Sequence, residues 1–333
     1  MKILITSLLL FSTIFFLQAQ GERACGTMQM LEQSIQDNPS ILNKMQQDEI
    51  SIYERASTNE ALKSGVITIP VVVHIVYNNA TQNISDNQIF SQITVMNEDF
   101  RRTNADAINT LPEFLGVAAD SEIDFCLATI DPNGDPTTGI QRVETTRNSW
   151  GFEQGMKYTA QGGVDGWPRD QYLNMWVVNF SGGLLGFAQF PGGGPPAEDG
   201  VVMGYNYFGT ENLNDGSFVL SPPFHLGRTT TQEVGHWLGL YHIWGDNQGG
   251  GCGGDDLVAD TPLQATATGG CPLKKQSCGS LDMVQNYMDY SNDACMNIFT
   301  QGQSVRMNNT KTGFPFRTSL ITSNGCGSLL TND

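Results

Sequence analysis

The stretch TTTQEVGHWLGLYHIWG constrains this chain more than any other part of its sequence. Residues four apart lie on the same face of a helix, one turn from each other, so Gln232 and His236 would point the same way. Glycine adopts positive φ at little cost, so Gly239 predicts the end of the helix and a turn that brings His242 back beside His236. With Glu233 next to the first of these positions, the spacing predicts a helix that ends in a metal site.

Two imidazoles and a neighbouring carboxylate suit a zinc site of the catalytic kind, in which three protein ligands leave a fourth position for water. His236 and His242 would be two of the ligands, and Glu233 would be the general base. The third ligand position falls on Gln232, where the pattern normally has histidine. A glutamine amide offers only a neutral carbonyl oxygen, and zinc prefers imidazole nitrogen or thiolate. We therefore expect a loss of metal affinity larger than the roughly 10–100-fold that follows removal of a residue that merely orients a ligand.

The other two histidines are not expected to take the third ligand position. His225 lies eleven residues before His236, ahead of the expected start of the helix. His74 lies in the β-branched run VITIPVVVHIVY, which predicts a buried strand, so a core histidine is expected there.

A second motif, NYMDYSND, follows the first by about fifty residues. It is similar to the tight Met-turn of metzincin proteases, which places a methionine beneath the metal. Met288 would be that methionine. Tyr290 would then lie near enough to donate a hydrogen bond to the oxyanion that develops during peptide hydrolysis.

The order of predicted strands and helices favours an α+β fold, a mixed sheet with helices on one side. Strands are expected over 66–77, 121–130 and 173–180, with a further short strand in the glycine-rich stretch GGLLGFAQFPGGGPP. The segment ISDNQIFSQITVMNEDFRR predicts a helix that starts with a capping box of Ser85 and Gln88. Its apolar face would hold Ile89, Ile93, Met96 and Phe100. After residue 243 we expect mostly loops until a short helix at TQGQSVRMNN.

The N-terminus has the composition of a secretory signal. A positive Lys2, an apolar run over 3–17 and the small Ala19 predict a signal peptide over residues 1–19, and therefore secretion. The alternative is an uncleaved anchor, but the run is short and polar residues follow at once. Residues 20–64 are predicted to be a pro-segment, because they are polar and partly helical in pattern. Residues 65–326 would then form the catalytic domain, with an N-terminal subdomain to about 243 and a C-terminal subdomain after it.

The net charge of −17 argues against a nucleic-acid or anionic-membrane partner, since both require basic patches. It suits a secreted protein that binds calcium or attracts basic substrates. No later segment is long and apolar enough to cross a bilayer, so no membrane span is expected in the mature chain.

The seven cysteines suit an exported, disulfide-bonded protein. Four of them lie between 252 and 295 and predict two bridges in a loop-rich region, for which the sequence leaves three pairings open. An odd total leaves at least one thiol unpaired.

Six segments together carry a resemblance to a known family. They are IPVVVHIVY, ISDNQIFSQITVMNEDFRRTN, LNMWVVNFSGGLLGFAQFPGG, GRTTTQEVGHWLGLYHIWGD, DLVADTP and QNYMDYSNDAC, in this order over roughly 66–310. The chain resembles the pappalysin family of the metzincin clan. This resemblance implies a metzincin-type fold with a twisted mixed sheet, an active-site helix and a C-terminal subdomain stapled by disulfides. It also implies a secreted zinc endopeptidase that acts on peptide or protein substrates.

Carried onto the matching positions, the resemblance implies zinc ligands at His236 and His242, with Gln232 at the place of the missing histidine. Glu233 would be the general base, Met288 the Met-turn methionine and Tyr290 the support of the transition state. Asp293 looks like the acidic residue that lines the pocket after the scissile bond. An acid there implies cleavage before Arg or Lys.

The same resemblance implies a structural calcium site at Asp256, the backbone of Ala259, and Thr261. The alternative for this acidic stretch is a solvated loop. Of the cysteines, Cys252 would pair with Cys278 and Cys271 with Cys295, while Cys126 and Cys326 lie outside these motifs and are either paired or buried. The stretch RACGT looks like the family's cysteine switch, in which Cys25 would bind the zinc and hold the proenzyme latent. The alternative for Cys25 is a leftover thiol.

Gln232 leaves three interpretations open. The chain is a zinc endopeptidase that tolerates glutamine with reduced activity, a pseudoprotease that binds peptides without cutting them, or a histidine-to-glutamine variant of an active enzyme. The intact Glu233, Met288, Tyr290 and Asp293 favour an enzyme of this class. A calcium-dependent adhesion module would need an exposed aromatic or acidic ligand face, and zinc content would distinguish it from the enzyme.

Overall fold

The computed structural model describes residues 23–58, 65–246 and 250–327, and the signal peptide expected at 1–19 lies outside them. Six strands form a mixed sheet in the order β2-β1-β4-β6-β5, with β3 beside the second half of β1. The strands are β1 Ile67–Tyr77, β2 Ile123–Leu127, β3 Ile140–Glu144, β4 Leu173–Val178, β5 Gly186–Ala188 and β6 Val201–Gly204. Only β5 runs antiparallel, along its neighbour β6 at the edge of the sheet. The mixed sheet predicted from the sequence is confirmed.

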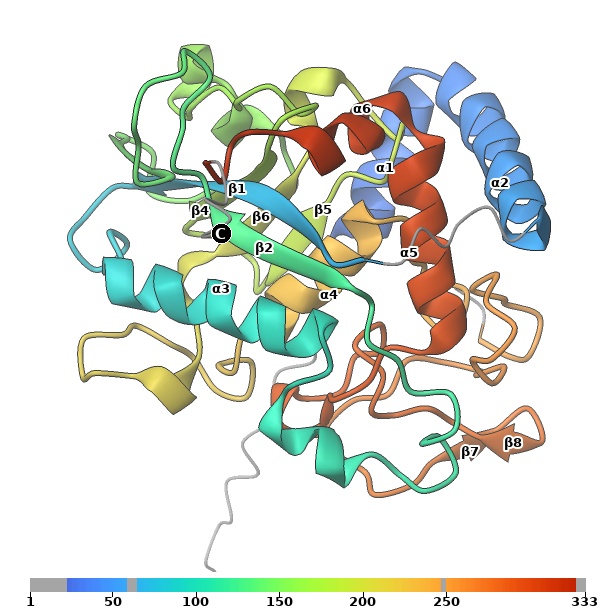
Figure 1. Cartoon of the computed structure of the whole chain (residues 1–333). Coiled ribbons are helices and arrows are strands. Elements are labelled where there is room, and N and C mark those ends of the chain that lie inside the picture. The colour runs from blue at the N-terminus through green and yellow to red at the C-terminus, as the bar shows by residue number, and fades with distance from the viewer. Residues whose placement is uncertain (1–22, 59–64, 247–249, 328–333) are drawn as a thin grey trace, which may run out of the picture.

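Two helices cover one face of this sheet, α3 (Asp86–Phe100) and α4 (Arg228–Trp237) (Figure 1). Alternate residues of β1, such as Val71 and Val73, pack against Phe100 of α3 and Trp237 of α4 in one continuous core. The opposite face buries Trp176 and Val202 under connecting segments and under Met30 of the N-terminal helix α1 (Thr27–Asp37). Outside residues 27–58, the helices that pack on this sheet therefore lie on one side, as the sequence predicts.

The helix α3 forms where expected, and all four residues of its predicted apolar face are buried. Its capping box is only half formed. The Ser85 hydroxyl accepts from the Gln88 N–H at 3.2 Å, but the Gln88 amide donates to the carbonyls of Tyr205 and Phe208 instead of returning to the helix start. The buried connection between β6 and α4 supplies carbonyl acceptors that compete for this amide.

After residue 243 the chain is mostly loop, as predicted, up to α5 (Gln301–Gly313) and α6 (Pro315–Thr318). The loops hold one small hairpin, β7 (Gln276–Ser277) with β8 (Ser280–Leu281). Short 3-10 helices lie in the connections, at Ala105–Asn109, Gly155–Lys157, Thr159–Gln161, Pro196–Glu198, Tyr205–Tyr207, Glu211–Leu213, Asp293–Cys295 and Ser319–Thr322.

Three disulfides join Cys252 to Cys278, Cys271 to Cys295, and Cys126 to Cys326. The first two are the predicted pairs, and the third ties the C-terminal segment to strand β2. The thiol of Cys25 is unpaired.

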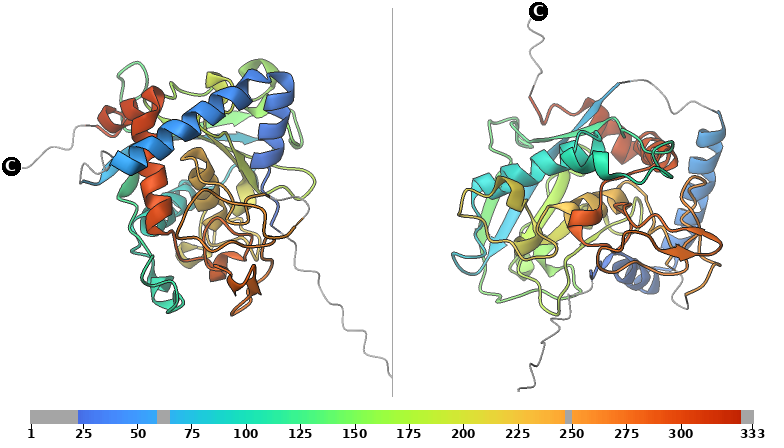
Figure 2. Two further views of the ribbon diagram at one scale, coloured as in Figure 1. Left: turned by 90° about the vertical axis from the view of Figure 1, so that its right-hand side faces the viewer. Right: turned by 90° about the horizontal axis from the view of Figure 1, so that it is seen from below.

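Residues 27–58 form two helices, α1 (Thr27–Asp37) and α2 (Ser40–Thr58), outside the sheet. Figure 2 shows α2 lying across α5 on the outer side of the molecule. The sequence indicated helix around α2 but not α1. Within the described residues no helix is long and apolar enough to cross a membrane.

Candidate active site

The helix α4 holds the motif, and its ten residues are all buried. It starts after Gly227, whose φ of 83° is in the left-handed region. Its first residue, Arg228, forms ion pairs with Asp99 of α3 and with Asp106. At the other end Gly239 has a φ of 91°, which confirms the predicted turn.

The turn brings His242 back to His236, with their Nε2 atoms 3.1 Å apart. The Nδ1 atom of His236 lies 2.7 Å from the Leu240 carbonyl, and that of His242 lies 2.5 Å from an Asp246 carboxylate oxygen. Because each Nδ1 faces an oxygen acceptor, it carries the proton and leaves the Nε2 lone pair free. Both Nε2 lone pairs therefore meet at one point, as a metal site requires.

The third group at this point is the Cys25 thiol, whose Sγ lies 3.6 Å from His236 Nε2. The ligand atoms of Cys25, His236 and His242 all lie within 4.8 Å of one another. Zinc bond lengths of about 2.0 Å to nitrogen and about 2.3 Å to sulfur give tetrahedral edges of roughly 3.3 Å between two nitrogens and roughly 3.5 Å between nitrogen and sulfur. The separations of 3.1 and 3.6 Å match these edges, so the three residues fit a zinc ion.

Gln232 lies where the motif places its first ligand. Its Nε2 donates to the Asp289 carbonyl at 3.1 Å, and its Oε1 is buried without a hydrogen-bond partner. One oxygen of the neighbouring Glu233 is likewise buried and unpaired. Two orphaned acceptors in one buried site indicate room for a cation, because a buried oxygen without a donor is costly.

Glu233 is fully buried, and burial raises its pKa to about 7. Its Oε2 accepts from the Thr27 hydroxyl at 2.8 Å and lies 3.5 Å from Cys25 Sγ. Burial and the Glu233 carboxylate raise the pKa of the Cys25 thiol. Burial and then His242 lower the pKa of His236.

Met288 lies directly beneath the helix. A Cβ at Gly235 would stand 2.6 Å from Met288 Sδ, so only glycine allows this approach. Tyr290 packs edge-on against His242, with ring centroids 4.9 Å apart. Burial, Cys25 and Asp246 raise the pKa of Tyr290, so its hydroxyl keeps its proton.

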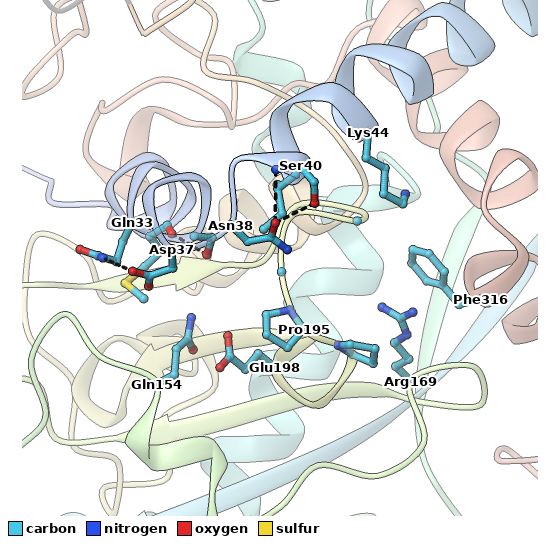
Figure 3. A pocket seen from close by; sticks show the side chains of 16 residues that line it. Gln33, Asp37, Asn38, Ser40, Lys44, Gln154, Arg169, Pro195, Glu198 and Phe316 are labelled. Atoms are coloured by element: carbon cyan, nitrogen blue, oxygen red, sulfur yellow. Dashed lines mark hydrogen bonds between the residues drawn. The ribbon is translucent and has the colours of Figure 1, made fainter.

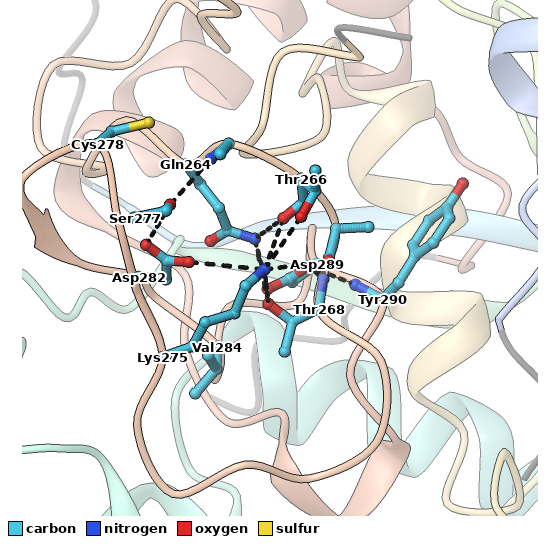
Figure 4. Close-up of polar contacts among 12 residues, drawn as sticks. Gln264, Thr266, Thr268, Lys275, Ser277, Cys278, Asp282, Val284, Asp289 and Tyr290 are labelled. Atoms are coloured by element: carbon cyan, nitrogen blue, oxygen red, sulfur yellow. Dashed lines mark hydrogen bonds and ion pairs between the residues drawn. The ribbon is translucent and has the colours of Figure 1, made fainter. Parts of the chain in front are cut away.

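The turn that contains Met288 is held by the buried carboxylate of Asp289 (Figure 4). This side chain accepts from Gln264 Nε2 at 3.0 Å and from the N–H groups of Thr268 and Tyr290, each at 2.8 Å. Since the Asp289 carbonyl also receives Gln232, one residue links the turn to the active-site helix.

Asp293 is fully buried and is paired with Arg23. Arg23 Nη2 lies 2.5 Å from Asp293 Oδ1, and neither side chain is exposed to solvent. The guanidinium also donates to the Ser291 carbonyl and the Thr229 hydroxyl, and it lies over the Phe224 ring. In this chain the Asp293 carboxylate is thus occupied by the basic side chain of Arg23.

Between Arg23 and α1 the chain adds to the sheet edge. The Gly26 N–H donates to the Gly186 carbonyl at 2.8 Å, and the Leu185 N–H donates to the Ala24 carbonyl at 3.0 Å. The Ala188 N–H donates to the Thr27 hydroxyl at 2.8 Å. Residues 23–27 thus cross the site along β5.

The residues of the expected calcium site are only partly brought together. The Asp256 carboxylate accepts from the Thr261 hydroxyl at 2.8 and 2.9 Å, and burial raises the pKa of Asp256 to about 7. Ala259 is exposed beside them.

Comparisons with known proteins show the family of the chain. Residues 159–311 match the family model of pregnancy-associated plasma protein-A. An extracellular metalloprotease of Arthroderma benhamiae is 31% identical, covering 87% of this chain and 90% of the relative, and one of Arthroderma otae is 33% identical over 72% and 76%. The chain belongs to the pappalysin family of metallopeptidases.

Two solved pappalysin structures are similar to different extents of the chain. A mutant promirolysin of Tannerella forsythia is 43% identical with a TM-score of 0.81, covering 90% of this chain and 97% of that one. Mature mirolysin of the same organism, in complex with a cleaved peptide, is 48% identical with a TM-score of 0.72 and covers 77% and 96%. The proenzyme therefore matches more of this chain than the mature enzyme does.

Sequence reasoning missed several functional neighbours in this pappalysin. Arg23 lies in the RACGT stretch, two residues before Cys25. Its positive charge beside the thiol was a signal for a contact with an acidic residue of the site. Thr27 had none, because its contact with Glu233 joins residues 206 positions apart. Asp246 lies only four residues after His242, so its spacing was a signal that could have been used. Among the described residues, the group that could share a metal with His236 does not include His225.

The helices α1 and α2 do not pack against the rest of the described chain along their whole length. A cavity of about 450 Å³ remains between them and the loop at 192–198 (Figure 3). Its polar lining includes Lys44 and Gln33 from the helices and Arg169 and Glu198 from the catalytic part. The three residues that could hold a metal, Cys25, His236 and His242, do not line this cavity.

Proposed function

We propose that this pappalysin is a secreted zinc endopeptidase, made as a latent proenzyme, that cuts peptide bonds before Arg or Lys. Residues 1–19 would be its signal peptide, 20–64 its pro-segment and 65–326 its catalytic domain. The buried pair of Arg23 and Asp293 supports this proposal most directly. Arg23 lies two residues before Cys25, whose thiol faces both His236 and His242. A pro-segment that offers a basic side chain and a metal ligand together blocks both the specificity pocket and the reaction centre.

The residues would divide the work as follows. His236 and His242 would hold zinc, with Gln232 at the third position, and when bound the zinc would acidify the attacking water and polarise the scissile carbonyl. Glu233 would take the proton of the water and pass it to the leaving amine. The protonated hydroxyl of Tyr290 would donate to the oxyanion. Asp293 would bind the basic side chain that follows the scissile bond.

Cys25 would hold the enzyme latent, and Met288 would support the site from below. Calcium would bind at Asp256, Thr261 and the Ala259 backbone. The contact between Asp256 and Thr261 supports this site, because calcium takes carboxylate, hydroxyl and carbonyl oxygens.

A second function is favoured by one observation, the glutamine at position 232. With two imidazoles in the catalytic part, the mature chain would be a pseudoprotease that binds basic peptides in the Asp293 pocket without cutting them. The machinery around Gln232 is otherwise complete, which favours impaired catalysis over none.

The test is a cleavage assay with the pro-segment removed, zinc and calcium supplied, and a quenched peptide with Arg after the scissile bond. This chain and its Gln232→His variant run side by side. If both cut, glutamine suffices; if only the variant cuts, Gln232 disables an intact site. If neither cuts but both bind the peptide, the pseudoprotease is the better description. Failure to cut or bind would refute the proposal.

A further inference from the structure

The metal site of this chain is divided between two parts of the molecule. Within residues 23–58, 65–246 and 250–327, one group of three His, Cys, Asp or Glu side chains is arranged to hold a metal. Two members, His236 and His242, come from the catalytic part, and the third is Cys25. In the usual motif a histidine at position 232 would make the catalytic part sufficient by itself.

Gln232 is a poor replacement for that histidine. Its amide nitrogen is committed to the Asp289 carbonyl, so only the neutral Oε1 is left for a metal. Zinc binds thiolate and imidazole in preference to a neutral carbonyl oxygen. The two strongest donor types at this site are therefore the two imidazoles and the Cys25 sulfur.

The Cys25 sulfur is also held firmly in place. Arg23 on one side is fixed by its buried pair with Asp293, and Thr27 on the other donates to Glu233 at 2.8 Å. Gly26 donates to the sheet edge at Gly186. A ligand fixed from both sides loses little conformational entropy when it binds, which strengthens its hold on the metal.

We propose that Cys25 is the ligand that retains zinc in this chain, so that releasing residues 23–58 lowers the zinc affinity of the protein. This rests on the proposed latency, and it extends it. Over a site with three histidines, a pro-segment thiol covers a metal that the histidines retain after the pro-segment leaves. In this chain the thiol of Cys25 supplies one of the strong ligands. When zinc binds, the thiol gives up its proton to solvent and the sulfur donates to the metal. Activation and metal loss are then coupled, and the mature chain depends on free zinc around it.

A cycle of four full-length chains tests this without any activity measurement. The chains are the unaltered protein, Cys25→Ser, Gln232→His and the double variant, and the readout is the zinc dissociation constant from competition with a chromophoric chelator. Removing a residue that only orients a ligand costs roughly 10–100-fold in affinity, so losing the sulfur should cost at least about 100-fold in the Gln232 background. In the Gln232→His background the same change should cost under about 10-fold, because three imidazoles remain. Equal losses in the two backgrounds would overturn the proposal.

A second readout covers the case in which Cys25→Ser fails to fold. The unaltered full-length protein is loaded with Co²⁺, and its near-ultraviolet absorption is recorded for a thiolate-to-cobalt charge-transfer band. The band is expected, and its absence at full loading would overturn the proposal. Peptide cleavage by the activated Gln232→His chain is measured separately. A chain that cuts while its zinc affinity ignores Cys25 refutes the ligand role alone, and one that needs Cys25 for zinc but never cuts refutes only the proposed function.

Discussion

Asp293 and Arg23 form a completely buried pair, so loss of this one carboxylate would leave a buried positive charge without its partner. Removing one partner of a buried, hydrogen-bonded charge pair costs about 2–5 kcal/mol. We predict that Asp293→Asn, made in the Gln232→His background, lowers kcat/KM for a peptide with Arg after the scissile bond by about 30-fold or more. A peptide with Leu at that position serves as the control and should change little. Parallel losses on both peptides would mean that Asp293 supports the fold of the pocket instead of its specificity.

His74 is the core histidine that the sequence predicted. Its ring is fully buried, stacks on Trp176 and lies between the side-chain amides of Gln141 and Asn174. Burial lowers the pKa of His74 to about 4, against 6.5 in an unfolded chain. The unfolded chain therefore takes up this proton at higher pH than the folded one.

It follows that the free energy of unfolding falls as the pH drops from 6.5 towards 4, and His74 should account for up to about 3 kcal/mol of that fall. We predict a shallower acid dependence in His74→Gln, measured by urea unfolding at several pH values. The other titratable groups are common to both proteins, so the difference isolates His74. An unchanged slope would contradict the prediction.

At the scale of elements, α2 of the expected pro-segment is attached to α5 by one ion pair. Arg306 Nη1 donates to Glu49 Oε2 at 3.0 Å, and a second bond makes the contact bidentate. The same arginine donates to the Gly239 carbonyl at 2.7 Å, at the turn between the two histidines. Arg306 therefore connects α2 to the loop between His236 and His242.

We predict that Glu49→Gln loosens α2 by about 1–2 kcal/mol, since Glu49 is partly exposed and its pair is weaker than a fully buried one. Hydrogen exchange of α2 amides should then be roughly 10-fold faster. Asp48→Asn is the matched control one residue away, because the ion pair that Asp48 forms among the described residues is with Lys44 on the same surface helix. Equal exchange in the two variants would show that Glu49 is not the anchor.

The sequence predicted those elements that have a strong period of their own. The β1 run, the buried face of α3 and the turn at Gly239 all follow from local pattern and glycine chemistry. Strands β3 and β6 were missed, because their five and four residues gain their conformation from pairing with β1 and β4. The metal ligands came from spacing, whereas the orientation of Gln232 towards Asp289 depends on a contact across 57 positions that no local rule provides.

At the scale of the molecule, the disulfides close loops of very different length. Cys126 and Cys326 are 200 residues apart, and Cys252 and Cys278 are 26 apart. In the chain-entropy account the longer closure stabilises by about 5 kcal/mol and the shorter by about 3.5 kcal/mol. We predict that Cys126→Ser with Cys326→Ser lowers the free energy of unfolding more than Cys252→Ser with Cys278→Ser does. Urea unfolding of the two double variants measures this, and the reverse order would show that local packing at Cys252 outweighs loop entropy.

The edge strand β5 has a consequence for the chain in solution. Its outward backbone groups at Leu185 and Gly186, and the N–H of Ala188, are all satisfied by residues 24–27. Once those residues leave, β5 becomes an open sheet edge, and open edges favour pairing with other chains. A mature chain without peptide would therefore be the form that self-associates in storage, while the full-length chain would stay monodisperse at the same concentration.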